Sequence, residues 1–463
     1  MSDQNKQMIL FSLAFVLRLP FLFFGYGVEE DSWGHVLNAA LMYENGSYEI
    51  SRLPGHPILE ALLMVLWKVH SPFLFNLPAA LASSGSVVVF YRILNRTPNK
   101  LAMWWSIAFS MIPIMYISGT YTVDYSLALF FSLLSYESLI SGKLERAGIW
   151  LAVATGFRIT SLGFLIPFAY WLLVNKEQEK SKALRLRKVA KLFFISIGVS
   201  LIFYIPPMHN YGMAFFDFHR PPYPNFVEAI YKTTIGPWGV LGIIAVIIAK
   251  TQLIKRKSIN FKNREFNFLF LVILVYGIAF FRMPEKAAFW LPVVPFSLMY
   301  ISRHVSLLIA RLSILFLIFS PLLFGINKTD PYTGSDHSPL AITFGSADGE
   351  LFFDPIQGPI FNDYTKRINK LEAVEKIEHN IMLIRKPTVV IAGWWYAMIE
   401  VDKRDGKWSN ANIKVLYYAL PKELEQWKEK GYELRYLPKQ EIVNDKKYNT
   451  TYTVNNATLL PIE

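Results

Sequence analysis

Long apolar runs alternate with short polar loops over the first 325 residues of the chain. A helix needs about 20 mostly apolar residues to cross a bilayer, and about 17 can suffice. Runs of this kind begin near residues 8, 73, 101, 125, 146, 160, 191, 238, 265, 287 and 305. The pattern predicts an α-helical polytopic membrane protein with about eleven transmembrane helices. The first run, residues 8–24, contains Arg18 and no small-residue cleavage site, so we expect a retained helix and not a signal peptide.

One short segment, residues 57–71, carries Glu60, Lys68 and His70 within apolar sequence. If this segment crosses the membrane, every later loop changes side. Lys and Arg concentrate in the cytoplasmic loops of membrane proteins. With a cytoplasmic N-terminus and residues 57–71 lying in the interface as an amphipathic helix, each basic loop falls on the cytoplasmic side, including the dense run at residues 176–191. We therefore predict this topology, in a multi-pass protein of the plasma membrane.

The same topology places several polar segments together on the outer face. These are residues 29–56, 121–124, 206–237 and 282–286, together with Arg158. Charged and polar residues gathered on one side of a membrane protein are candidates for a common site. The predicted chemistry is therefore extracytoplasmic.

Beyond residue 325 the apolar pattern ends. Strand-like runs then alternate with helical patterns, which predicts a small α/β unit. The strand-like runs are residues 340–344, 387–392 and 413–419, and the helical patterns are residues 365–377 and 421–430. We expect a membrane domain at residues 1–325 and a soluble extracytoplasmic domain at residues 326–463.

Composition supports membrane insertion and excludes some kinds of site. Hydrophobic residues make up 53% of the 463 residues and charged residues only 18%, whereas about a quarter of the residues in soluble domains are charged. The net charge of +12 arises from Lys and Arg in short loops, as in topology signals, so we expect no nucleic-acid partner. The chain has no cysteine, which excludes disulfides and thiolate metal sites.

An acidic cluster, Glu29, Glu30 and Asp31, follows the first apolar run. Carboxylates beside hydrocarbon are costly unless they are paired or reach water, and this cluster can simply be solvated beyond the helix end. Apolar residues at helical spacing from Trp33 to Leu41, however, predict an amphipathic juxtamembrane helix that begins at the acids. Asp31 is then held at the bilayer surface, where it can activate a hydroxyl beside a lipid-borne phosphate.

Further charged positions lie on the same predicted side. Asp124 precedes an apolar run, where Asp is also a favoured helix N-cap. Arg158 lies in an apolar Gly-Phe-Arg-Ile-Thr turn, and its guanidinium needs an anionic partner, either Asp124 or a phosphate. Arg282, Glu285 and Lys286 precede a proline-broken helix; they can hold a phosphate and a sugar, or extend to the membrane surface as helix ends commonly do.

Two aromatic segments are candidates for ligand contact. Residues 206–237 carry His209, Asp217 and His219 among aromatic residues, which suits contact with carbohydrate or lipid. A metal site made from these three residues is disfavoured, because their spacing matches no standard ligand pattern. The aromatic residues at 394–396 follow a predicted strand; sugar stacking is one interpretation, and docking onto the membrane domain is the favoured one.

The order and common side of these motifs resemble the GT-C superfamily of membrane glycosyltransferases, in particular the branch with protein O-mannosyltransferases and lipid A aminoarabinose transferase. In that family an acidic residue follows the first span, which matches Asp31, and an amphipathic helix leads to a His-Pro-Pro-Leu-like element. Here this element reads His56-Pro57-Ile58-Leu59, so Ile58 replaces the second Pro. The acidic run leaves the catalytic residue open among Glu29, Glu30 and Asp31, and the spacing back from Asn45-Gly46 favours Asp31.

The remaining family motifs follow in order. Asp124 matches the second acidic residue, and Arg158 matches the basic residue of the next pair of short helices, where Lys is more usual. Glu285 and Lys286, followed by the prolines of the Pro292-Val-Val-Pro295 segment, match the late basic, aromatic and proline element. The resemblance covers about residues 8–325, and the soluble domain matches no family.

The resemblance implies a GT-C-like enzyme that moves a sugar from a dolichyl- or undecaprenyl-phosphate donor to a hydroxyl of a glycan, lipid or protein acceptor at the outer face. It implies Asp31 as general base, with Glu30 and Asp124 as further catalytic residues. The residues expected to bind substrate are Arg52, His56, Arg158, His209, His219, Arg282, Glu285 and Lys286. A divalent cation such as Mg²⁺ or Mn²⁺ is compatible with this chemistry but not required by it.

The competing class is a transporter or lipid flippase. Many spans and intramembrane charges fit that class. Broken helices in two matching halves, the usual sign of a transporter, are not evident in the sequence. The glycosyltransferase interpretation is therefore favoured.

Overall fold

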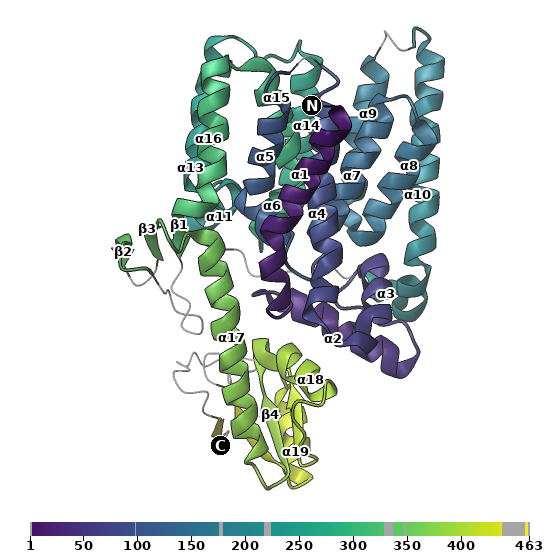
Figure 1. The fold of residues 1–463 in the computed structure, drawn as a ribbon. Coiled ribbons are helices and arrows are strands. Elements are labelled where there is room, and N and C mark those ends of the chain that lie inside the picture. The colour runs from purple at the N-terminus through teal and green to yellow at the C-terminus, as the bar shows by residue number, and fades with distance from the viewer. Residues whose placement is uncertain are drawn as a thin grey trace.

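The computed structural model describes residues 2–97, 99–175, 179–216, 224–327, 337–346, 349–437 and 459–461. Helices form a bundle over the first two-thirds of the chain, and a smaller unit of strands and helices lies beyond one end of it (Figure 1). The helices of the bundle are α1 (Asp3–Arg18), α4 (Pro72–Leu94), α5 (Ala102–Met111), α6 (Pro113–Ser118), α7 (Tyr125–Ile140), α8 (Leu144–Phe157), α9 (Leu165–Val174), α10 (Lys182–Tyr211), α13 (Val240–Lys255), α14 (Arg264–Arg282), α15 (Val293–His304) and α16 (Leu307–Leu323).

Helical segments occupy every place at which an apolar run predicted a span. In the described part of the chain, four helices are long and apolar enough to cross a membrane, or five if the bent pair Phe226–Trp238 and Val240–Lys255 is one span. The predicted run near residue 101 is broken, because Pro113 cannot donate the hydrogen bond that would continue α5 into α6. The number of about eleven spans therefore stays a prediction.

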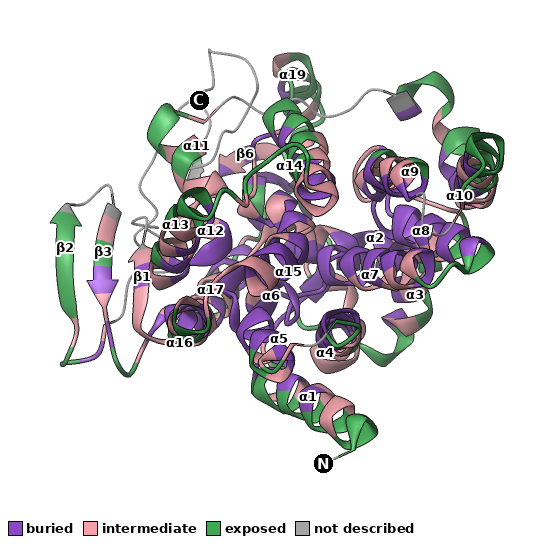
Figure 2. Ribbon diagram, turned by 90° about the horizontal axis from the view of Figure 1, so that it is seen from above, coloured by how far each residue is buried: buried purple, intermediate pink, exposed green. Residues whose placement is uncertain are grey.

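Burial follows the layering of the bundle. Buried residues gather around α7, α8 and α15, whereas α1 and α10 carry wide exposed strips (Figure 2). On α10 the exposed side chains include Phe194, Ile202 and Ile205. Large exposed apolar faces on outer helices are typical of contact with lipid. The structure thus has the form of an integral membrane protein.

Two helices lie across the end of the bundle that faces the smaller unit (Figure 1). The first, α2 (Glu30–Asn45), begins at the acidic cluster as predicted, where carboxylates in the first turn favour a helix N-terminus. It ends at Gly46, whose φ of 63° is accessible to glycine without steric cost. The second, α3 (Pro57–Leu66), occupies the predicted interfacial segment.

The loop between α2 and α3 is ordered by a buried carboxylate. Glu60 of α3 accepts hydrogen bonds from the Ser51 backbone N–H at 3.0 Å and the Ser51 hydroxyl at 2.9 Å, and also from the Tyr48 hydroxyl. These bonds satisfy polar atoms that would be costly to bury without a partner. They also fix the loop that carries Arg52 and His56.

The smaller unit contains a four-stranded sheet with strand order β5-β4-β6-β7. The central strand β4 (Thr388–Ile391) is buried along its whole length and pairs in parallel with β5 (Ile413–Leu416) and β6 (Glu433–Tyr436). β7 (Leu460–Pro461) pairs antiparallel with β6. Helices α17 (Pro359–Met382), α18 (Tyr396–Arg404) and α19 (Pro421–Glu429) accompany this sheet. β4, β5, α17 and α19 overlap predicted strands and helices, whereas β6, β7 and α18 were not predicted.

A second sheet comes between α16 and α17 in the chain and lies to one side of the end of the bundle (Figure 1). It is antiparallel with order β1-β3-β2, formed by β1 (Phe324–Asn327), β2 (Ile342–Ser346) and β3 (Gly349–Phe353). The sequence predicted only a strand that overlaps β2. The boundary predicted after residue 325 falls inside β1.

Candidate active site

The acidic cluster is paired with cations from distant parts of the chain. Lys286 Nζ lies 2.6 Å from Asp31 Oδ2 and 2.7 Å from Glu29 Oε2. Arg52 Nη2 lies 3.4 Å from the same Asp31 oxygen, and Arg52 Nη1 lies 3.4 Å from Glu285 Oε2. Helix α2, the loop after it and the segment after α14 therefore converge on one point.

The three neighbouring carboxyl groups experience different environments. Burial alone would raise the pKa of Asp31, but the charges of Lys286 and Arg52 outweigh it and hold that pKa well below its ordinary value. Burial raises the pKa of Glu30 to about 7. Repulsion from Asp31 adds to this rise, and a hydrogen bond with Tyr417 opposes it. At neutral pH Asp31 is ionised, whereas Glu30 is partly protonated.

A second group of charges lies in the loops before α7 and after α8. Arg158 Nη1 donates to Asp124 Oδ2 at 2.7 Å, and His56 Nδ1 lies 3.7 Å from the same oxygen. Asp124 occupies the N-cap position of α7, but its side chain makes no capping hydrogen bond. Burial would raise the pKa of Asp124, and Arg158 with the nearby imidazoles lowers it to about 2. The carboxylate therefore serves the ion pair and not the helix end.

The Arg158 guanidinium lines a cleft. It sits over the rings of Tyr125 and Phe289, 4.6 Å from each centroid, as in cation–π contacts. The lining of the cleft is mainly apolar, and Tyr276 and Leu291 contribute to it. A cation in an apolar, aromatic lining suits a ligand with a phosphate on a hydrocarbon chain.

The two groups of charges form one site. Asp31 and His35 are four residues apart on α2 and so share a face of that helix. The His35 ring lies edge-on to the His56 ring, with centroids 5.0 Å apart. The charge of Asp31 also acts on the Arg158 guanidinium. The sequence placed all of these residues except His35, whose only signal was its spacing of four from Asp31.

Some predicted site residues lie elsewhere. Arg282 is the last residue of α14 and is exposed, and His209 is exposed near the end of α10. Within the described residues, neither side chain joins the network of ion pairs. The predicted contribution of His219 and the disfavoured metal site with Asp217 lie outside the described residues.

The aromatic segment after β4 divides into an inner and an outer residue. Trp395 is buried in an apolar cluster that joins α2 and α3 to the smaller unit. Trp394 is 57% exposed. The favoured docking interpretation therefore fits Trp395, whereas Trp394 lies on the surface.

Crystal structures of ArnT from Cupriavidus metallidurans, a GT-C lipid A aminoarabinose transferase, share this fold. The structure bound to undecaprenyl phosphate matches with a TM-score of 0.58 and 9% identity, over 98% of this chain and 97% of that chain. The apo structure matches with a TM-score of 0.53 and 10% identity, over 94% of each chain. No protein-family model and no curated protein sequence matches the chain. The chain therefore shares the fold of these ArnT structures, so the resemblance that the motifs indicated is confirmed for the fold.

Proposed function

We propose that this chain is a glycosyltransferase that moves a sugar from a polyprenyl-phosphate donor to an acceptor hydroxyl at the outer face of the membrane. The observation that carries the proposal is the set of paired charges around Asp31 and Asp124, of which Arg158 lines the aromatic cleft. An undecaprenyl-phosphate complex of the ArnT fold supports the same class of ligand. The acceptor is a glycan, lipid or protein.

The reaction follows from the charges on either side of the sugar. The acceptor oxygen attacks the anomeric carbon, and the bond from this carbon to the phosphate oxygen breaks on the opposite face, so the configuration inverts. Asp31 takes the acceptor proton, which contributes on the order of 10²- to 10⁴-fold in rate. The polyprenyl phosphate departs with the bonding electrons, and Arg52, Arg158 and Lys286 stabilise its charge.

The ion pairs of Asp31 in the unliganded site affect when Asp31 can act as a base. Lys286 and Arg52 hold Asp31 in its ionised form and make it a weak base. A donor phosphate competes for the same two cations, because both donate hydrogen bonds that suit phosphate oxygens. Once they turn to the phosphate, the pKa of Asp31 rises and its basicity increases. Donor binding thus activates the base.

Neighbouring carboxyl groups fit other roles. Glu29 shares Lys286 with Asp31, and Glu30 interacts with Tyr417 of the smaller unit. We assign the base to Asp31 because it contacts both cations that a leaving phosphate would need. Asp124, held by Arg158, positions the acceptor.

Replacement of Asp31 by Asn tests the proposal. The amide cannot accept the proton but keeps the size of the side chain, so turnover is expected to fall at least about 10²-fold. The measurement is transfer of radiolabelled sugar from undecaprenyl- and dolichyl-phosphate donors by the purified protein, with donor binding measured in parallel. Glu44→Gln, at an exposed position of the same helix, is the matched control and should retain turnover.

Two outcomes would contradict this assignment. Wild-type turnover by Asp31→Asn, with loss of turnover in Glu30→Gln, would move the base to Glu30. Movement of lipid-linked sugar across proteoliposomes by the wild type, without transfer to any acceptor hydroxyl, would favour a flippase.

A further inference from the structure

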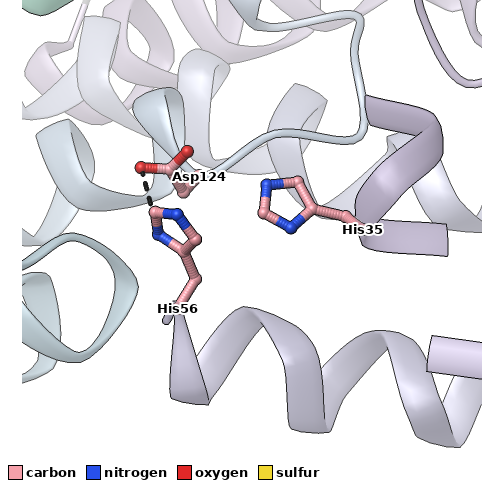
Figure 3. A group of neighbouring side chains, drawn as sticks. All are labelled: His35, His56 and Asp124. Carbon is pink, nitrogen blue, oxygen red and sulfur yellow. Dashed lines mark ion pairs between the residues drawn. The ribbon is translucent and has the colours of Figure 1, made fainter. Parts of the chain in front are cut away.

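Two imidazoles and one carboxylate lie together at the inner side of the site. His35 comes from α2, His56 from the N-cap of α3 and Asp124 from the N-cap of α7. The three are 4%, 7% and 2% exposed. One nitrogen or oxygen atom from each lies within 4.8 Å of the other two, and the side chains face a common space (Figure 3).

His35 gives this cluster an unsatisfied polar atom. Its Nδ1 is buried and makes no hydrogen bond with any described residue. Buried polar atoms almost always have a partner, because an unpaired one costs the hydration that it has lost. A buried, unpaired imidazole nitrogen in a cluster with another imidazole and a carboxylate therefore points to a ligand at this place.

The hydrogen bonds of the other two side chains leave one ligand atom on each. His56 Nδ1 donates to the Phe157 carbonyl oxygen at 2.8 Å, which leaves the lone pair of the ring on Nε2. A backbone carbonyl that fixes the tautomer in this way is the common second partner of a metal-bound histidine. Asp124 uses Oδ2 for its contact with Arg158, so Oδ1 remains available to an ion.

We propose that His35, His56 and Asp124 form a binding site for one divalent transition-metal cation, of the Zn²⁺ or Mn²⁺ type. Two imidazoles with one carboxylate suit such ions and leave positions open for water or substrate oxygen. Mg²⁺ and Ca²⁺ bind less well here, because they prefer oxygen ligands. Ligands about 2.1 Å from one ion lie at most about 4.2 Å apart, so binding draws the side chains inward by side-chain rotation.

The position of the ion suggests what it does. It lies one helical turn from Asp31, on the same face of α2, and beside the Arg158 that faces the cleft. A cation there would polarise an acceptor oxygen or a phosphate oxygen. This effect rests on the proposed function, whereas binding of the ion does not.

Metal content of the full-length purified protein tests the site. After treatment with a chelator, Zn²⁺ is added back, unbound metal is removed by gel filtration, and bound zinc is measured by mass spectrometry. We expect one zinc per chain in the wild type and an affinity at least about tenfold lower in His35→Gln. His209→Gln, which removes an exposed histidine of α10, should bind as the wild type does. Thermal unfolding shows whether each variant is folded.

Several results would overturn the site. These are an absence of retained zinc in the folded wild type, and equal zinc affinity in the wild type and His35→Gln. If His35→Gln does not fold, His56→Gln is measured in its place, with the same expected loss of zinc affinity. The zinc content of the wild type tests the site without any variant. Bound zinc without sugar transfer would contradict the proposed function and leave the site standing. Sugar transfer by a folded wild type that retains no zinc would contradict the metal site and leave the proposed function standing.

Discussion

Each of the two site carboxylates is paired with a cation from elsewhere in the chain. Lys286 is 255 positions from Asp31, and Arg158 is 34 positions from Asp124. The Asp124–Arg158 pair is almost fully buried, and removal of one member of a buried pair typically costs about 3–5 kcal/mol because the other charge is stranded. Loss of activity in a variant of this pair therefore has to be separated from loss of folding.

The raised pKa of Glu30 predicts a pH dependence of stability. Its pKa is about 7 in the folded protein against an ordinary value of 4.5, so the folded state binds more protons than the unfolded state between these values. Stability from this group is present at low pH and is lost as the pH rises through about 7. We expect the melting temperature of Glu30→Gln to fall less than that of the wild type between pH 5 and pH 8.

The measurement is thermal unfolding of both proteins across this range. Glu44→Gln serves as a control at an exposed carboxylate of the same helix, and should keep the wild-type dependence. Identical pH dependence in the wild type and Glu30→Gln would show that Glu30 has an ordinary pKa.

The sequence predicted many residues of the candidate site, because charged side chains within apolar sequence on one side of a membrane need charged or polar partners on that side. Asp31 pairs with Lys286, Asp124 pairs with Arg158, and the charge of Asp31 acts on Arg158, whereas the roles of these residues stay predictions. Arg282 could not be separated from Lys286 in advance, because the direction of a side chain after a helix end depends on the turn that follows. His35 was missed, since one histidine in an amphipathic helix has no distinctive pattern.

Helix α17 connects the smaller unit to the loops of the bundle through hydrogen bonds. Its Arg367 is 2% exposed, and its guanidinium donates to the carbonyl oxygens of Phe21 and Thr120 at 2.9 and 3.1 Å. Lys370, one turn further on, donates to the Val28 carbonyl at 2.7 Å. One helix of the smaller unit is thus bonded to both loops that carry the site carboxylates.

Replacement of Arg367 by Met tests this connection. Met retains most of the apolar volume but leaves two buried carbonyls and the Thr120 hydroxyl without their donor. Each unsatisfied group typically costs about 1–3 kcal/mol, so we expect a loss of roughly 2–4 kcal/mol after partial relaxation. The measurement is equilibrium or thermal unfolding in detergent. Lys376→Met, at an exposed position of the same helix, should be close to neutral, and equal stability of the two variants would refute the expectation.

Element positions were predictable to different extents. β4, β5 and α19 match their predicted runs within a few residues, because local periodicity defines them. β1 and β3 were missed, since a short strand is defined by its partner, and β1 pairs with β3 across an intervening stretch of chain. The break of one apolar run at Pro113 has a local cause that the sequence did contain.

The whole molecule has a predicted orientation that the absence of cysteine makes easy to test. Lys422→Cys on α19 and Arg187→Cys at the start of α10 each add one exposed thiol. In intact cells a membrane-impermeant maleimide should label the first variant and not the second, since charged residues of the basic run are expected on the cytoplasmic side. Labelling of Arg187→Cys alone would invert the topology, and equal labelling after lysis confirms that both thiols are accessible.

The hydrogen bonds from α17 to the two loops have a mechanical consequence. Val28 directly precedes Glu29, and Thr120 lies four residues before Asp124, so each anchor point is within four residues of a carboxylate of the candidate site. A stiff rod attached at both places moves them in concert. Tilting of the smaller unit would therefore shift both loops together relative to the cleft, without a change in the distance between them.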